Sequence, residues 1–319
     1  SRAVILLYHR VIDIKYDPFG MAVGPQHFRA HMEYLKNHFR VISLAELVLR
    51  LKQGRLLNKS VVITFDDGYV DNYKYARPIL KSLQIPATFF VSSSLINTKK
   101  ELWWDRLTRV FDPRRTLPAY LKLRINDHNF KLKVCTGDQK KELFLVIHSI
   151  LKRLPLQEIN TAVGFLERWA KLKKPQRTKQ RTMNEHELRK IAAIDLFDIG
   201  VHTSHHVVLS YLSPILQRKE ILQSKERLES VIHSPIKLFS YPFGLKNDYS
   251  VNTIRLLKNC GFNASCSNFA GIVTLGSNQY ELPRVRILNW DLQIFKKVIS
   301  FFLSSRAIVS SLRSSQYVF

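Results

Sequence analysis

Short apolar runs alternate with helix-like segments along the first ninety residues, and this alternation restricts the folds open to the chain. The apolar runs at 3–8, 61–65 and 86–91 have the length and composition of buried strands. Between them, segment 26–39 carries apolar residues at the three- and four-residue steps of one helix face, and the Tyr-rich segment 69–83 is helix-like. Strands that alternate with helices in this way predict parallel βα units.

The alternation stops near residue 98 and resumes after residue 181, where a further strand is expected at 197–201. Two helix-like runs, 140–154 and 159–172, lie inside the interruption. A chain of 319 residues with 45% hydrophobic content can bury a large core. We therefore predict one α/β catalytic domain over 1–319, with a mostly helical insertion at 98–181.

Positive charge is concentrated in this insertion. The formal net charge of the chain is +25, and segment 99–181 holds 21 Lys and Arg against 8 Asp and Glu, a net of +13. The excess fits either a solvated, Lys-rich helical surface or contact with an anionic glycan or membrane surface. A nucleic-acid partner is not expected, because no aromatic-basic RNA-binding motif or zinc-finger spacing accompanies the charge.

Cysteine usage and hydropathy constrain the cellular context. The three cysteines are odd in number and lack a CxxC spacing, so we expect reduced thiols without a disulfide framework. No run of eighteen apolar residues is present, so a transmembrane segment is not expected. A signal peptide is not visible. We expect an exported or cell-envelope protein if such a peptide was removed, and a cytoplasmic one otherwise.

Two adjacent carboxylates follow the central apolar run. Asp66 and Asp67 come directly after 61–65, and Gly68 then turns the chain. Two acids at a strand end are costly unless their charge is neutralised, which a metal ion and a catalytic proton would do. The alternative is a strand-end turn in which the two acids and the glycine only cap the next helix.

A histidine cluster follows the strand expected at 197–201. His202 and His206 are four residues apart, so on a helical turn both imidazoles face one way, as metal ligation requires. His205 would point elsewhere. In a parallel barrel the strand ends open on one face, so these imidazoles and a carboxylate can converge on one ion. The alternative is a surface turn with incidental histidines.

Three segments together resemble the motifs of a known family. TFDDGY at 64–69, HTSHH at 202–206 and FSYPFG at 239–244, in this order, are similar to the first three motifs of the polysaccharide deacetylases of carbohydrate esterase family four. The resemblance implies a distorted (β/α) barrel, a divalent metal ion, and removal of acetyl groups from an amino-sugar glycan or glycolipid. Zn²⁺ is the expected ion, with Co²⁺, Ni²⁺ and Mn²⁺ as alternatives.

The resemblance also implies roles for individual residues. Asp66 would be the general base, while Asp67, His202 and His206 would hold the metal. The backbone N–H of Phe243 would meet the oxyanion, a role that a main-chain donor keeps when the family's usual Tyr is replaced by Phe. These assignments divide two adjacent acids between two tasks.

Two positions depart from the family pattern. Many relatives have Arg two residues before the Pro of the third motif, where this chain has Ser240. Arg284 is our candidate for the missing partner of the base, with a surface Arg after a Pro turn as the alternative. Relatives also supply a late acid His, but no histidine follows His233. The YHRV segment at 8–11 resembles that of biofilm-type deacetylases, so we assign His9 as general acid. The alternative is that His9 has only a structural role.

Aromatic residues complete the expected site. Tyr69 and Tyr241 are expected to contact substrate, and Trp103 and Trp104 of the insertion could stack on sugar rings or form part of a core. Two other classes stay open besides the enzyme. One is an inactive glycan-binding relative, which the departures permit, and the other is a polyanion- or nucleic-acid-binding protein, suggested by charge alone.

Overall fold

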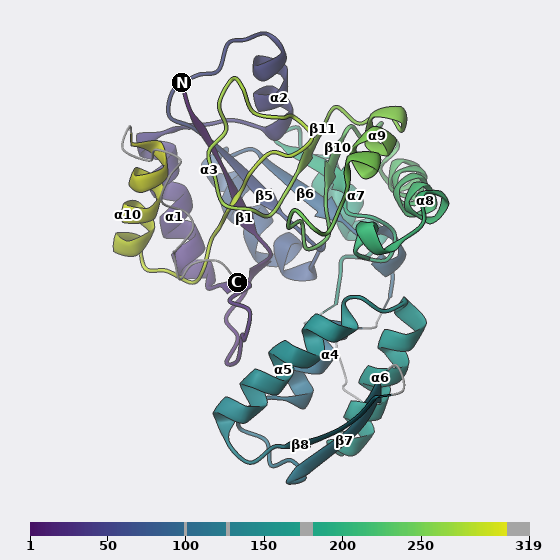
Figure 1. The fold of residues 1–319 in the computed structure, drawn as a ribbon. Coiled ribbons are helices and arrows are strands. Elements are labelled where there is room, and N and C mark those ends of the chain that lie inside the picture. Colours follow the sequence, from purple (N-terminus) through teal and green to yellow (C-terminus); the bar gives the residue numbers. More distant parts are fainter. Residues whose placement is uncertain (99–100, 126–127, 173–180, 305–319) are drawn as a thin grey trace. The chain divides into compact units, whose positions relative to one another are not determined.

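The computed structural model describes residues 1–98, 101–125, 128–172 and 181–304, and Figure 1 draws them as a ribbon. The chain forms two compact units. The first unit takes in 1–14, 19–98 and the part of the chain from residue 182 onward, and the second takes in 15–18 and 99–181. Each unit is described by itself below.

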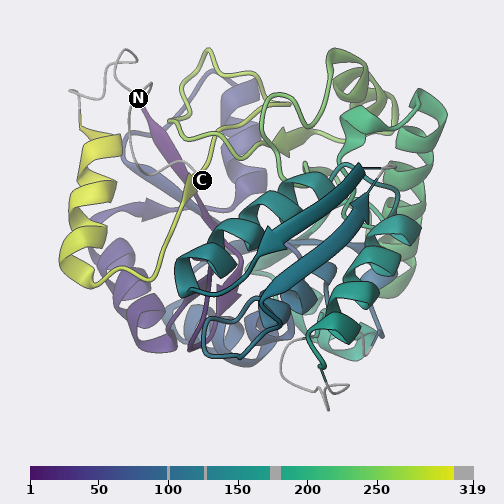
Figure 2. The ribbon, with the colours of Figure 1, turned by 60° about the horizontal axis from the view of Figure 1, so that its bottom comes forward.

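The first unit is organised on an eight-stranded, parallel sheet. Its strands lie in the order β11-β10-β9-β6-β5-β1-β12, and β4 pairs with β5. The strands are β1 (Ala3–Tyr8), β4 (Arg40–Val41), β5 (Ser60–Phe65), β6 (Ala87–Val91), β9 (Phe197–Val201), β10 (Leu238–Ser240), β11 (Ala264–Cys266) and β12 (Val285–Arg286). Figures 1 and 2 show helices surrounding this sheet, which forms a half-barrel, so the predicted α/β class is confirmed.

The helices of this unit begin at recognisable capping residues. Ser43, Asn184 and Ser250 each accept a hydrogen bond from the backbone three residues on. The helices are α1 (Pro25–His38), α2 (Leu44–Lys52), α3 (Arg77–Leu83), α7 (Glu185–Ala192), α8 (Pro214–Ile232), α9 (Val251–Asn259) and α10 (Leu292–Leu303). The sequence reasoning missed α10, which lies beside α1 in Figures 1 and 2.

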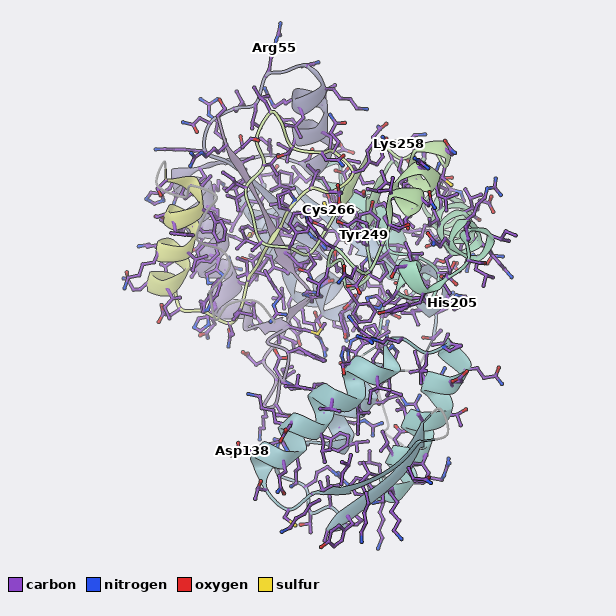
Figure 3. All side chains as sticks on the ribbon, viewed as in Figure 1. Arg55, Asp138, His205, Tyr249, Lys258 and Cys266 are labelled. Atoms are coloured by element: carbon purple, nitrogen blue, oxygen red, sulfur yellow. The ribbon has the colours of Figure 1, made fainter. Side chains whose placement is uncertain are left out.

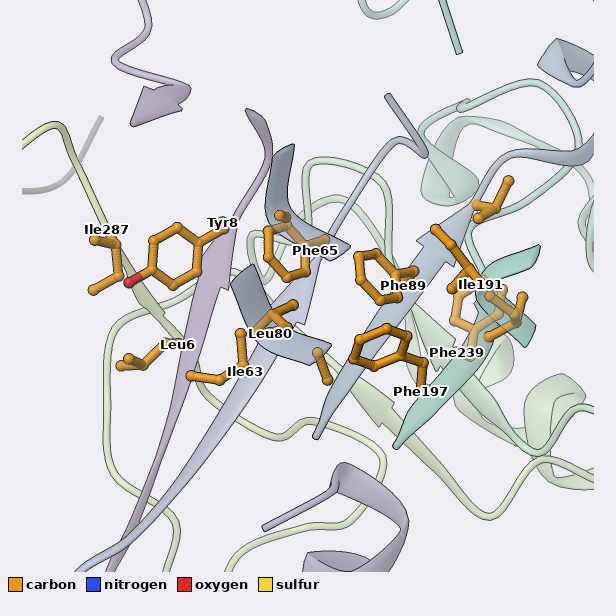
Figure 4. Close-up of a cluster of buried hydrophobic side chains, with 14 of the residues drawn as sticks. Leu6, Tyr8, Ile63, Phe65, Leu80, Phe89, Ile191, Phe197, Phe239 and Ile287 are labelled. Atoms are coloured by element: carbon orange, nitrogen blue, oxygen red, sulfur yellow. The ribbon is translucent and has the colours of Figure 1, made fainter. Parts of the chain in front are cut away.

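The core of the first unit lies between the sheet and its helices. Every residue of β1, β5 and β6 is buried, as expected of parallel strands that are covered on both faces. Figure 4 shows side chains of these strands in one row, where the rings of Phe65 and Phe89 stack with centroids 4.8 Å apart. This packing fixes the strand ends that carry the polar residues described below.

A short segment joins the two sides of the sheet. Leu282 bridges Cys266 at the end of β11, and β12 pairs with β1 through Val285 and Arg286. Segment 282–286 therefore bridges β11, at one edge of the sheet, and β1, with Arg284 in its middle. The side chain of Arg284 is 1% exposed, so it points into the unit and not into solvent.

Two smaller strands and a π-helix lie next to the central strands. β2 (Arg10–Val11) pairs with β3 (Ala22–Val23). The helix expected at 69–83 is divided into a π-helix, Asn72–Ala76, and α3. π-helical turns are rare in proteins, and those that do occur are frequently found at functional sites.

Over its described residues, the second unit contains three helices and a β-hairpin. Its elements are α4 (Trp103–Val110), β7 (Tyr120–Ile125), β8 (His128–Lys133), α5 (Gly137–Leu151) and α6 (Leu156–Trp169). The expectation of a mostly helical insertion therefore missed a hairpin of two six-residue strands. Lys122 and Lys131 are exposed and face each other across this hairpin. Like charges directly opposite each other destabilise a strand pair.

Other expectations concern thiols and membranes. All three cysteines are free, and Cys266 lies inside the first unit, whereas Arg55 extends away from it (Figure 3). Among the described residues, no helix combines the length and apolar character needed to cross a bilayer.

Candidate active site

Polar residues lie at the carboxyl ends of three strands of the sheet. Asp66 and Asp67 follow β5, His202 follows β9, and Ser240 ends β10. Because all these strands are parallel, their carboxyl ends open on one side of the sheet, where α/β proteins bind ligands. All four side chains are buried.

Asp67, His202 and His206 form a compact group of metal-ligand type. Oδ1 of Asp67 lies 3.5 Å from Nε2 of His202 and 3.2 Å from Nε2 of His206. One ligand atom from each residue lies within 4.8 Å of the others. A carboxylate and two imidazoles are a donor set that suits Zn²⁺ and related divalent ions, so the residues present fit such an ion.

The orientation of His202 supports this fit. Its Nδ1 donates a hydrogen bond of 2.8 Å to the carbonyl oxygen of Ser240, which leaves Nε2 on the side of Asp67. Metal-binding histidines commonly use their second nitrogen in this way. Burial raises the pKa of Asp67, but the hydrogen bonds from His202 and His206 together with nearby positive charge outweigh it, so the pKa lies well below its ordinary value and the carboxylate is held ionised.

The backbone around this group is strained. Non-glycine residues rarely adopt a positive φ, because the side chain then crowds the backbone. The metal-ligand group and its immediate neighbours contain four such residues, Asp67 (71°), Thr203 (58°), His206 (55°) and Phe243 (61°). Strain of this kind collects at functional sites, where surrounding packing enforces it.

Asp66 makes a bidentate ion pair with Arg284. The two guanidinium nitrogens Nη1 and Nη2 donate to Oδ1 and Oδ2 of Asp66 at 2.8 and 2.7 Å. Nε of Arg284 donates to the carbonyl oxygen of Ser267 at 2.7 Å, which fixes the remaining side of the guanidinium group. Arg284 is therefore placed where a partner of the base would have to be.

The charges around Asp66 set its protonation state. Burial raises the pKa of the Asp66 carboxyl, but the positive charges of Arg284 and His202 outweigh it, so the pKa lies below its ordinary value. Asp66 and Asp67 are thus both ionised, yet their partners differ. Asp66 pairs with an arginine, and Asp67 faces two imidazoles.

His9 lies at the edge of the same group. Strand β1 is in register with β5 so that Tyr8 pairs with Phe65, and the backbone N–H of Asp66 donates to the Tyr8 carbonyl. Burial lowers the pKa of His9, while Asp67 and Asp66 raise it, and the net pKa lies below its ordinary value. As a whole residue His9 is partly exposed.

The remaining residues of the second and third motifs take different positions. The ring of Phe243 packs edge-on against the ring of His206 with centroids 4.9 Å apart, so this residue is a neighbour of the metal-ligand group. His205 turns away from this group, and its Nδ1 bonds Oε1 of Glu220 at 2.7 Å. Figure 3 shows His205 at the periphery of the first unit.

Four aromatic residues expected to contact substrate are buried. Tyr69 lies under the guanidinium group of Arg10, and Tyr241 stacks on Tyr249 while its hydroxyl donates to the Tyr280 carbonyl. Trp103 and Trp104 pack against each other inside the second unit, where they are 6% and 4% exposed. Stacking on a sugar ring needs an exposed ring face, so Trp103 and Trp104 take the alternative stated from the sequence, core packing. The rings of Tyr69 and Tyr241 are likewise covered by neighbouring side chains, which argues against the expected contact of these rings with substrate.

Two polar residues near His9 were not singled out from the sequence. Asp71 accepts a hydrogen bond from the backbone N–H of Val11 and pairs with Arg10, and the side chain of Asn72 donates to the carbonyl oxygen of His9. A signal was present, because both residues lie within three positions of the end of the first motif. A single sequence, however, does not tell which strand their side chains will reach.

Comparisons with known proteins agree with this geometry. The family model described as polysaccharide deacetylase matches residues 53–114 and 149–265. YxkH of Bacillus subtilis, whose own name as a polysaccharide deacetylase is provisional, is 24% identical over 90% of this chain and 72% of its own length. The poly-beta-1,6-N-acetyl-D-glucosamine N-deacetylase of Staphylococcus aureus is 23% identical over 90% of this chain and 79% of its own length.

A solved structure shares the fold. The Streptococcus pyogenes deacetylase PplD, in complex with acetate, superposes with a TM-score of 0.59 at 18% identity, covering 91% of this chain and 93% of that one. Since the family model matches more than half of the sequence, the chain belongs to the polysaccharide deacetylase family. The resemblance stated from the three motifs is therefore confirmed.

Proposed function

We propose that this protein is a metal-dependent carbohydrate N-deacetylase that hydrolyses the acetamide group of an amino-sugar glycan. The observation that carries the proposal is one juxtaposition. An ionised carboxylate, Asp66, is fixed by Arg284 directly beside the Asp67, His202 and His206 group. Hydrolysis of an amide at neutral pH needs a general base next to an activated water, and this arrangement supplies both positions.

The metal-ligand group has one task in this proposal. A divalent cation held by Asp67, His202 and His206 would lower the pKa of a water molecule and polarise the acetyl carbonyl. Each of these three residues is buried, so the donors are positioned before anything binds. The protein's own residues then carry the proton transfers.

Asp66 accepts the proton in the first half of the reaction. The water oxygen bonds to the acetyl carbon, its proton passes to Asp66, and the backbone N–H of Phe243 faces the oxygen on which negative charge develops. Arg284 stabilises the ionised form of Asp66, which keeps it ready to accept a proton.

His9 supplies the proton in the second half. The bond between the acetyl carbon and the sugar nitrogen breaks, the nitrogen takes a proton from His9, and acetate and a free amine leave. Burial favours the neutral imidazole in the resting site. Negative charge that develops on the acetyl oxygen would raise the pKa of a nearby imidazole, so His9 takes up a proton from solvent before it donates to the nitrogen. Asp66 releases the proton it accepted to solvent when acetate leaves, which restores both residues.

The substrate class comes from the relatives. The Staphylococcus aureus relative is named for poly-beta-1,6-N-acetyl-D-glucosamine, so a polymer of N-acetylglucosamine is the first substrate to test. An inactive glycan-binding relative is the competing function, because Ser240 replaces the family's arginine. Acetate release separates the two.

Adjacent histidines provide the matched pair for the experiment. Acetylated glucosamine oligomers are incubated with wild type, His206→Ala and His205→Ala, and acetate and oligomer masses are measured. We expect chelation to abolish release and metal to restore it. His206→Ala should lose about 100-fold or more in turnover and should bind metal weakly, whereas His205→Ala should keep both. Metal-loaded wild type that binds oligomers but releases no acetate would establish the binding protein instead.

A further inference from the structure

Ser240 connects the base to a metal ligand. It is the last residue of β10 and its side chain is fully buried. Its carbonyl oxygen accepts the Nδ1 hydrogen of His202 at 2.8 Å. Because a carbonyl can only accept, this contact requires His202 to carry a proton on Nδ1 and to present Nε2 to Asp67. One residue therefore fixes the tautomer of a ligand through its main chain.

The hydroxyl of Ser240 makes a second pair of contacts. It lies 2.9 Å from Nη2 of Arg284 and 3.2 Å from Oδ2 of Asp66. A guanidinium group can only donate, so the hydroxyl accepts from Arg284 and its single proton must be directed at Asp66. The serine thus becomes a third donor to the Asp66 carboxylate, in addition to the two nitrogens of Arg284.

The site gives this hydroxyl no other described partner. The guanidinium of Arg284 occupies the space between Ser240, Asp66 and Ser267, with contacts of 2.7 to 2.9 Å on its three nitrogens. A larger side chain at residue 240 would compete with that guanidinium for the same buried volume. Segment 282–286, which brings Arg284 into the unit, and the small residue at 240 therefore depend on each other.

We propose that Ser240 positions the general base, Asp66. The Ser240 hydroxyl accepts a hydrogen bond from Arg284 and donates one to Oδ2 of Asp66, so it fixes the guanidinium group and the carboxylate relative to each other. In the family pattern the third motif itself supplies the arginine. In this chain segment 282–286 supplies it as Arg284, and Ser240, at the position of the family's arginine, orients it. This inference rests on the proposed deacetylase activity. It adds that residue 240 contributes to turnover and not to substrate binding.

Ser240→Ala tests the inference against a matched control. Ser265 is also buried, lies on the adjacent strand β11, and uses its hydroxyl for Tyr241 and Tyr280, away from Asp66. We expect Ser240→Ala to lower kcat about tenfold with KM and metal affinity unchanged, because one hydrogen bond to a charged group is lost. Ser265→Ala should leave kcat unchanged and affect only the melting temperature.

A double-mutant cycle shows whether Ser240 acts through Arg284. In an Arg284→Met background the hydroxyl has lost the guanidinium that orients it, so adding Ser240→Ala should lower kcat by less than about twofold. The same cycle measured on urea unfolding should show coupling between the two positions, which provides a readout independent of activity. If Ser240→Ala does not fold, Ser240→Cys, which keeps a weak donor, should fall between wild type and the Arg284→Met variant.

The possible failures can be told apart. Wild type that releases no acetate would overturn the proposed function. Wild type that is active, with Ser240→Ala equal to Ser265→Ala in kcat, would overturn the role of Ser240 and leave the function intact. Equal losses in kcat from Ser240→Ala in the wild-type and Arg284→Met backgrounds would also contradict it, because the hydroxyl would then act independently of Arg284.

Discussion

Among its described residues, the first unit contains two buried arginine–aspartate pairs that are chemically alike but lie in different surroundings. Arg284 holds Asp66 through two hydrogen bonds of 2.7 and 2.8 Å, and Arg10 holds Asp71 at 2.9 Å. All four residues are at most 3% exposed. Burial and pairing alone therefore do not identify a catalytic acid. The surroundings of each pair must be compared.

Those surroundings differ in charge and in what the carboxylate contacts. Burial raises the pKa of both acids, but it is outweighed only at Asp66, where His202 adds to Arg284 and the pKa falls below its ordinary value. The pKa of Asp71 stays above its ordinary value despite Arg10. The second carboxylate oxygen of Asp71 accepts a hydrogen bond from the backbone N–H of Val11. In the proposed reaction the first pair keeps the general base ionised, whereas the second holds the chain next to His9.

The largest effect is expected from Asp66→Asn. The amide cannot accept a proton at neutral pH, so turnover per folded molecule should fall about 10³-fold, within the range that a general base contributes. Metal binding, measured by calorimetry, should persist because Asp67, His202 and His206 are unchanged. Acetate release by this variant at a tenth of the wild-type rate or more would remove Asp66 from the reaction.

Asp71→Asn makes the same chemical change in the other pair. It leaves the Arg10 guanidinium buried beside a neutral group, so the free energy of unfolding should fall by about 3 kcal/mol in urea titrations. Turnover per folded molecule should change far less than in Asp66→Asn, because the side chain of Asn72 still holds the His9 carbonyl. Replacing both partners, with Arg10→Met and Asp71→Leu, should restore much of the lost stability.

A loss of turnover in Asp71→Asn as large as that in Asp66→Asn would break the distinction between the two pairs. It would mean that the segment around His9 must be held as rigidly as the base itself. Turnover therefore has to be corrected for the folded fraction of each variant, since both substitutions disturb a buried ion pair.

The residues at the carboxyl ends of the strands could be predicted from the sequence, because each lies directly next to a strand that the sequence itself reveals. Asp66, Asp67 and the His202–His206 pair each follow a recognisable strand, and parallel pairing brings strand ends together. The arrangement of Arg284 is not local. It depends on segment 282–286 bridging β11 and β1, and a two-residue strand such as β12 has no periodicity to detect.

Burial explains the other differences. Tyr69 and Tyr241 lie beside the motifs, and their neighbours in sequence do not disclose that Arg10 and Tyr249 cover their rings. The hairpin of the second unit was missed for a similar reason. Its basic residues, such as Lys122 and Lys131, lie at alternating positions of two strands, but a concentrated charge excess is equally compatible with a solvated helical surface.

The smallest effect is expected at His31, a buried titratable residue without an ion pair among the described residues, and it concerns the pH dependence of stability. It extends the comparison of the two buried ion pairs to a buried group that has none. His31 on α1 stacks on Phe295 of α10, and Nε2 bonds the Trp290 carbonyl. Burial lowers its pKa to about 4. The unfolded chain therefore binds more protons than the folded one between pH 4 and 6.5, so stability falls as pH is lowered through that window. From pH 7 to 5, wild type should lose about 2 kcal/mol more unfolding free energy than His31→Gln. His38→Gln, an exposed histidine on the same helix, should behave as wild type, and equal losses in all three proteins would contradict the prediction.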